Sequence, residues 1–248
     1  MKKALLLTAV FCFIFTVFHA PETYAREKNR SGSYQGRKGS GTFQRNVTRT
    51  NGQSIKSTTW QNERGEGNRQ TEKNWDNTTG TGSYSSSTTN AAGKTISRSG
   101  TVTKNEDGSF TKQGTITGTN GNTATVQSAI TKNEDGGRSI TKTYTGQDGN
   151  TFDINKTIQK TETGRTVSGN YSSSAGESGT FESTKTVSDG TVTKEQTLTN
   201  QDQETWQRNI ERTQGDGTVT RDVTTVNPDG ETNSFSQTAT FDKPDAGN

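Results

Sequence analysis

Carboxylates are the residues of this chain that come closest to the requirements of acid–base or metal chemistry. Paired carboxylates occur in Asn105-Glu106-Asp107 and again in Asn133-Glu134-Asp135. Such pairs act as general acid and base where a desolvated cleft separates their pKa values, and their oxygens suit Ca²⁺. Both pairs precede a glycine in turn sequences, and their spacing matches neither an EF-hand loop nor a calcium-binding nonapeptide. We assign them to turns and expect no catalytic residue and no metal-binding residue.

Aromatic side chains are the best candidates for ligand contact. Trp60, Trp75 and Trp206 present flat faces that suit sugar rings. They also fall in recurring apolar positions, where large aromatic residues usually anchor packing. Packing is therefore the preferred interpretation, and contact with a glycan is the alternative.

Thr-x-Thr pairs recur and form a second candidate surface. Alternation in a strand places both hydroxyl groups of each pair on one face. Flat arrays of this kind resemble the ice-binding faces of some antifreeze solenoids, although the pairs here do not keep one register. The pairs are Thr101-Val-Thr103, Thr115-Ile-Thr117, Thr141-Lys-Thr143, Thr191-Val-Thr193, Thr197-Leu-Thr199 and Thr218-Val-Thr220.

The first 25 residues have the pattern of a bacterial signal peptide. Two lysines precede an apolar run that is too short for a comfortable membrane span, and Thr23-Tyr24-Ala25 supplies the small residues that a signal peptidase reads. We predict cleavage after Ala25 and a secreted protein, located outside the cell, at the cell surface or in the periplasm. After cleavage we expect no membrane span.

Cleavage removes the single cysteine, histidine and methionine, Cys12, His19 and Met1. The mature chain then has no disulfide, and no imidazole or thiol to bind a metal, move a proton or attack a substrate. We expect that the protein is not an enzyme and uses no cofactor.

The composition limits the size of the core. Leu, Ile, Val and Phe make up about 11% of residues 26–248, below the roughly 20% under which disorder becomes an alternative. Low net charge and regular spacing argue against disorder. The totals of 29 basic and 26 acidic residues lose Lys2, Lys3 and Glu22 on cleavage, which leaves a net charge of +2. So small a charge predicts no nucleic-acid partner.

Glycines set a period of about 28 residues. The unit Thr101-Val-Thr-Lys-Asn-Glu-Asp-Gly108 returns as Ala129-Ile-Thr-Lys-Asn-Glu-Asp-Gly136, and a turn sequence falls every 12 to 15 residues. Between the turns lie segments of about ten residues rich in Thr, Ser, Val, Ile and aromatics, which is strand composition. Each repeat unit is therefore predicted to hold two strands and two turns.

Asn-Gly and Asp-Gly pairs favour β-hairpins. A type I′ turn needs positive φ at both central residues, which Asn, Asp and Gly tolerate best. The pairs are Asn51-Gly52, Asp107-Gly108, Asn120-Gly121, Asp135-Gly136, Asp148-Gly149, Asp189-Gly190, Asp216-Gly217 and Asp229-Gly230.

Three all-β architectures fit two strands per period. The first is an antiparallel β-meander of hairpins, curled so that its apolar columns face each other; the second is a β-solenoid with one coil per unit. The third, a membrane barrel, is the weakest, because lipid-facing positions need more apolar residues than these strands carry. Hairpin turns favour the repetitive antiparallel meander, with the solenoid as the alternative.

Four regions follow from these patterns. Residues 1–25 are the signal peptide, 26–38 a basic flexible leader, 39–242 the repetitive β domain and 243–248 a flexible tail. We expect a structural or adhesive role at the cell surface or in the extracellular matrix, with self-association through sheet edges. The alternative is a binding module for glycan, calcium or ice.

Overall fold

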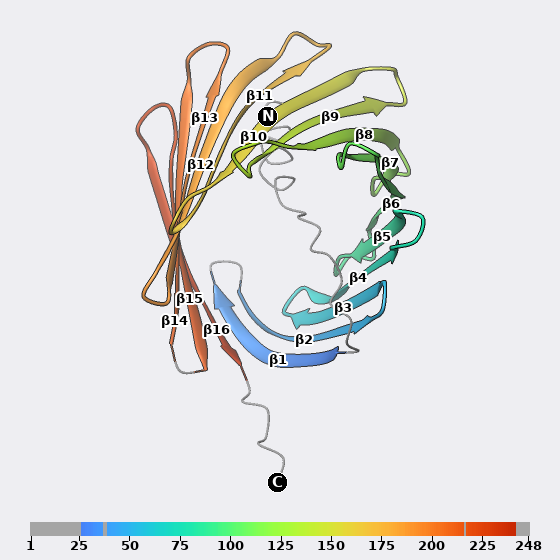
Figure 1. Cartoon of the computed structure of the whole chain (residues 1–248). Coiled ribbons are helices and arrows are strands. Elements are labelled where there is room, and N and C mark those ends of the chain that lie inside the picture. Colours follow the sequence, from blue (N-terminus) through green and yellow to red (C-terminus); the bar gives the residue numbers. More distant parts are fainter. Residues whose placement is uncertain (1–25, 37–38, 216, 242–248) are drawn as a thin grey trace.

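Sixteen antiparallel strands form a closed barrel in the computed structural model, which describes residues 26–36, 39–215 and 217–241 (Figure 1). Each strand pairs with the next along the chain, and β1 pairs with β16. The strands are β1 Arg26–Gly36, β2 Gly39–Thr50, β3 Gln53–Asn62, β4 Gly65–Asp76, β5 Thr81–Thr89, β6 Thr95–Lys104, β7 Phe110–Thr117, β8 Thr123–Lys132, β9 Arg138–Gly146, β10 Thr151–Lys160, β11 Gly164–Ser173, β12 Ser178–Ser188, β13 Thr191–Asn200, β14 Thr205–Gln214, β15 Thr218–Val226 and β16 Thr232–Phe241.

The antiparallel hairpin chain expected from the turns is confirmed, and its closure is the new feature. Neighbouring strands exchange hydrogen bonds in the order of the sequence, whereas a solenoid would stack coil upon coil. In Figure 1 the first strand, in blue, lies beside the last, in red. Barrels with this number of strands enclose a lumen wide enough for water.

The prediction of a flexible leader over residues 26–38 is wrong for residues 26–36, because these residues form strand β1. It pairs with β2 along its whole length and with β16 at Gly32–Gln35. Its polar residues alternate between basic and neutral or acidic, which is the period of a strand with two different faces. The predicted signal peptide and the predicted tail both lie outside the described residues.

Hairpins form at the predicted turns, but most turns have a different type. Gly108 donates its N–H to the carbonyl of Asn105, and Asn105 to that of Ser109 (3.0 and 2.8 Å). Gly108 has φ +78°, while Asp107 does not have positive φ. This is a three-residue loop closed by a left-handed glycine. Among the described non-glycine residues, Asp189 and Gln203 have positive φ, so of the described pairs Asp189-Gly190 alone has positive φ at both residues.

The two faces of the sheet differ in burial, and the apolar face is the inner one. The described apolar side chains exposed by less than a tenth lie on one face of the strands, with Leu198 and Val223 each 1% exposed. Burial, and to a smaller extent Tyr84 in β5, raises the pKa of Tyr144 in β9. Those strands are about 19 Å apart along a flat sheet at 4.8 Å per strand. Their hydroxyls therefore converge on the concave side.

Aromatic rings on the inner face lie over glycines of neighbouring strands. A Cβ atom at Gly67 would fall on the indole of Trp60, its partner across β3 and β4. At Gly82, a Cβ would fall 2.7 Å from the Trp75 ring. Each ring thus fills the space that a side chain would occupy, which fixes the register where apolar residues are few.

A cluster of buried residues lies in the C-terminal half of the chain. Tyr171, Phe181 and Leu198 pack together with Ile154 and Val167, and Tyr144, Phe152, Ile158 and Trp206 lie against them. Tyr144 and Phe152 have ring centroids 6.4 Å apart, and Phe152 stacks on Tyr171 at 5.8 Å. This cluster lines the inner face of β9 to β14.

Replacing Gly67 by alanine tests the ring-over-glycine contact. Gly67→Ala should destabilise the protein by about 1–3 kcal/mol, because the methyl group displaces the Trp60 ring. Trp60→Ala should remove most of that penalty in the double variant, giving a coupling of about 1 kcal/mol or more in denaturant unfolding. Additive effects in the double-mutant cycle would contradict the contact. Thr59→Ala, on the outer face beside Trp60, is the control.

Candidate functional site

Charge is divided between the two faces of the barrel wall. The pairing register and the alternation of strands place every Lys and Arg of the strands from Lys28 to Arg221 on the inner face, and every Asp and Glu of the described strands on the outer face. The inner cations are Lys28, Arg30, Arg45, Arg49, Lys56, Arg69, Lys73, Arg98, Lys104, Lys112, Lys132, Arg138, Lys142, Lys156, Lys160, Arg165, Lys185, Lys194, Arg208, Arg212 and Arg221. The outer acids are Glu27, Glu66, Glu72, Asp76, Asp153, Glu182, Glu195, Glu211 and Asp222.

Several outer carboxylates are held by neutral neighbours. Asn46 donates to Glu27 at 3.1 Å, and Thr143 donates to Asp153 at 2.6 Å. Thr, Ser, Asn and Gln fill most of the remaining outer positions of the strands. The outer face is thus polar with a negative bias, while the inner face combines positive charge with apolar residues.

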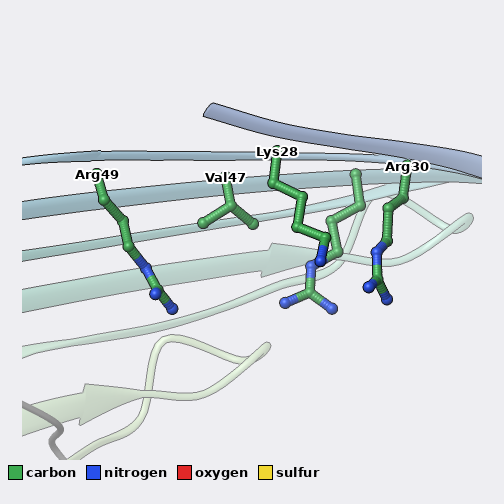
Figure 2. A pocket seen from close by; sticks show the side chains of 5 residues that line it. Lys28, Arg30, Val47 and Arg49 are labelled. Carbon is green, nitrogen blue, oxygen red and sulfur yellow. The ribbon is translucent and has the colours of Figure 1, made fainter. Parts of the chain in front are cut away.

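A pocket on the inner face of β1 and β2 gathers four cations. Its volume is about 260 Å³, and it is lined by Lys28, Arg30, Arg45, Val47 and Arg49. Figure 2 shows Lys28, Arg30, Val47 and Arg49 pointing to the same side of the two strands. Arg30 pairs with Arg45 across the strands, and Lys28 pairs with Val47. The alternation of each strand therefore gathers the four basic groups on one surface.

Mutual repulsion acts on the cations of this pocket. Burial, together with the charges of Arg30 and Arg49, lowers the pKa of Arg45 below its usual value. On β3, burial and the charges of Arg45, Arg69 and Lys73 lower the pKa of Lys56. An anion that approaches these cations stabilises them, since it offsets both the cost of burial and the repulsion between them.

A second basic group lies on β7, β9 and β10. Burial, followed by the charges of other inner cations, lowers the pKa of Lys112 and of Lys142 to about 8. Lys156 acts on both of them, and its own pKa is lowered by burial and by Arg165. The small buried side chain of Ser128 lies in register between Lys112 and Lys142. Lys112 and Lys142 therefore titrate near pH 8.

Basic and aromatic surfaces meet at this second group. Lys142 donates from Nζ to the hydroxyl of Tyr144 at 2.9 Å, and its ammonium lies 5.1 Å from the centroid of that ring. Burial raises the pKa of Tyr144. From β9 to β14, the inner residues near the end opposite the chain termini are Tyr144, Phe152, Tyr171, Phe181, Leu198 and Trp206, and those near the termini are Arg138, Lys160, Arg165, Lys185, Lys194 and Arg212.

The three candidate tryptophans share the inner face but lie on separate strands. Trp60 lies on β3 over Gly67, and Trp206 on β14 packs against the buried cluster. Trp75 on β4 lies 6.0 Å from Phe110 and donates from Nε1 to Asn77 at 2.9 Å. They form no common strip, and contact with a glycan stays a prediction.

Turn carboxylates serve the backbone. Asp107 accepts from the N–H of Ser109 at 2.9 Å, and Asp135 from that of Gly137 at 2.8 Å. Hydrogen bonds from Ser109 lower the pKa of Asp107. Within residues 26–36, 39–215 and 217–241, no group of three or more His, Cys, Asp or Glu side chains is placed to hold a metal ion.

All the predicted Thr-x-Thr pairs lie on the outer face, as alternation requires. Thr115, Thr125, Thr145 and Thr151 lie side by side across β7 to β10. The face they form is convex, because it is the outside of a closed barrel, and this differs from a flat array.

The candidate functional residues that the sequence reasoning missed are the inner lysines and arginines. Net charge hides them because the carboxylates of the outer face and of the turns together offset the inner bases. The sequence carries a signal for them. Within each strand, basic residues occupy one set of alternate positions and acidic residues the other, as Lys194 and Glu195 do in β13.

Comparisons with known proteins assign no relative to this chain. No family model matches it, and neither does any curated protein or solved structure. In the part of the chain that the structure describes, no helix has the length and apolar character of a membrane span.

The lowered lysine pKa values predict how stability depends on pH. Lys112, Lys142 and Lys194 release their protons near pH 8 in the folded protein, whereas unfolded lysine keeps its proton to about pH 10.4. The unfolded state therefore binds more protons above about pH 8, so the free energy of unfolding rises with pH. We expect the denaturation midpoint to rise between about pH 7.5 and 9.5.

Substitution of one inner lysine checks the cause. Lys142→Met should raise stability at pH 7.5 and reduce the slope with pH, because it removes a cation that burial disfavours. Lys94→Met, in the exposed turn between β5 and β6, is the matched control and should leave the slope unchanged. Equal slopes in both variants would contradict the assignment.

Proposed function

We propose that the mature chain is a secreted binding protein whose barrel lumen takes an anionic ligand. The single observation that carries this proposal is the division of charge: strand cations line the inside, and strand carboxylates lie outside. A concave surface of one sign, backed by a wall of low dielectric, concentrates the field and attracts ions of the opposite sign. The pocket of Lys28, Arg30, Arg45 and Arg49 is the proposed contact point.

The cost of this arrangement supports binding over a purely structural role. Half-buried lysines and arginines are disfavoured by desolvation and by each other. Thr, Ser or Gln at the same positions would fit the inner face without that cost, as Gln196 and Ser183 do. A barrel that served stiffness alone would gain nothing from so many inner cations.

The remaining features of the proposal come from the sequence. The predicted signal peptide supports secretion, and the polar outer face supports an aqueous location. We infer that the evolutionary unit is the hairpin repeat of about 28 residues, two strands at a time. Lack of His and Cys after cleavage supports a protein that binds and does not catalyse.

Multivalent anions should stabilise the protein at low salt. Pyrophosphate is expected to raise the thermal midpoint more than chloride at equal ionic strength. Arg45→Gln/Arg49→Gln should lose about tenfold or more in affinity by calorimetry, since each hydrogen bond between a guanidinium group and an anion contributes about 1 kcal/mol or more. The control is Arg64→Gln/Lys94→Gln, which removes the same charge from two exposed turns. Equal losses in both double variants would overturn the lumen as the site.

Self-association is a second candidate function, supported by the short seam of the barrel. β1 and β16 pair over four residues each, Gly32–Gln35 and Thr238–Phe241. The preceding part of β16, Thr232–Gln237, pairs with β15, and no described residue pairs with its other side. An unpaired edge without charged side chains is a template for another strand. A structural or adhesive role would use this edge.

Lysines on that edge should suppress association. Ser234→Lys/Ser236→Lys is expected to abolish any concentration-dependent increase in sedimentation coefficient, because charged edge residues oppose pairing. Ser83→Lys/Ser85→Lys places the same charges on the outer face of β5, a strand paired on both sides, and should have no effect. Association that persists unchanged in the edge variant would exclude this mode.

A further inference from the structure

We propose that the pocket on β1 and β2 holds the phosphate group of an amphipathic molecule, whose alkyl chain lies along Phe43 and Trp60. The inference rests on the proposed anion-binding function and adds the class of ligand. Its basis is the position of the basic pocket directly beside an aromatic surface on the same strands.

The charged part of the pocket suits a phosphate monoester. Arg30 and Arg45 are cross-strand partners, so their two side chains project from paired positions on neighbouring strands. Lys28 and Arg49 line the same space. Guanidinium groups bind phosphate through paired N–H donors. A dianion compensates several mutually repelling cations at once, whereas a single carboxylate compensates fewer.

Apolar surface begins two residues from Arg45 on β2. Phe43 precedes Arg45 on the inner face of that strand and lies about 7 Å from it, at 3.4 Å per residue. Phe43 pairs with Trp60 on β3 and lies over Gly32 on β1, where a Cβ atom would meet its ring at 3.3 Å. Both rings are half-buried. An anion in the pocket therefore has an apolar surface beside it on the lumen side.

The size of the pocket supports a ligand larger than an inorganic ion. Its volume of about 260 Å³ lies just below the range of roughly 300 to 1,000 Å³ in which drug-sized ligands bind. Val47 adds an apolar wall between the cations. Phosphate alone would leave this wall and the aromatic rings unused.

A free amphiphile fits better than a lipid within a bilayer or a polynucleotide. The pocket opens on the inside of a barrel whose outer face is polar, so the ligand has to enter as a single molecule. Its cations are gathered on two adjacent strands, whereas single-stranded nucleic acid is bound along an extended basic groove. Vesicles and oligonucleotides are therefore comparison ligands in the test.

Calorimetry with a series of alkyl phosphates tests the inference on the purified protein. Ethyl, butyl, hexyl and octyl phosphate, each below its micelle concentration, carry the same charge. We expect the dissociation constant to fall by at least about twofold per added methylene, where complete burial would give about fourfold. Octyl glucoside, which lacks the charge, should bind at least tenfold more weakly than octyl phosphate.

Two variants separate the parts of the ligand. Arg45→Gln should weaken binding of all four phosphates by a similar factor, while Phe43→Ser should reduce the gain per methylene and leave ethyl phosphate unchanged. Phe43→Leu is the second variant, should Phe43→Ser fail to fold, and should retain most of the gain. Arg64→Gln controls for net charge.

The outcomes distinguish this inference from the proposed function. Affinity that is flat along the series, with pyrophosphate still bound, overturns the amphipathic ligand and leaves the anion-binding lumen in place. Tighter binding to a single-stranded oligonucleotide, or to vesicles containing phosphatidic acid than to monomeric octyl phosphate, overturns it in favour of those partners. No binding of any phosphate overturns both.

Discussion

Closure of the sheet is the constraint on which the other properties of this protein depend. An open antiparallel sheet has two faces that both meet water, and alternation alone gives it two chemistries. Pairing β1 with β16 turns one of those chemistries inward. Apolar side chains then share a concave space, in which rings on neighbouring strands, such as Tyr144, Phe152 and Tyr171, pack together. The same closure confines the strand cations, so that charges on separate strands act together.

Stability in such a chain comes from many small contacts. Apolar residues are scarce, and the fully buried side chains, Leu198 and Val223, are modest in size. Three kinds of contact stabilise the fold: backbone pairing along every strand, rings placed over glycines, and hydroxyl or amide partners for the outer acids. The cations oppose folding because burial and repulsion disfavour them, and this cost is the physical argument for the proposed binding role of the inner face.

Local features of the fold were predictable from the sequence, and long-range ones were not. Glycine turns and ten-residue segments predict hairpins because turn geometry and strand alternation act within a few residues. Closure depends on the contact between Gly32 and Phe241, residues too far apart for any local pattern to reveal. The basic segment beginning at Arg26 suggests a flexible leader because cations usually face water. Inside a lumen, cations on a strand also face water, so the alternation of basic and other residues is the feature that identifies this segment as a strand. The spacing of Trp60 and Trp206 places them at apolar positions. The inner cations beside them can be recognised only from the alternate positions that basic residues occupy within each strand.

The seam between the first and last strands also sets an order of events during synthesis. Residues Gly32–Gln35 cannot complete their pairing until Thr238–Phe241, which come much later in the sequence, have been made. Until then the hairpins form an open, curved sheet whose apolar and basic face is accessible from the side. A ligand present at that stage meets the inner face before the wall is complete, whereas a ligand arriving later has to enter through an end. Pairing of β16 with β1 therefore changes the route into the lumen.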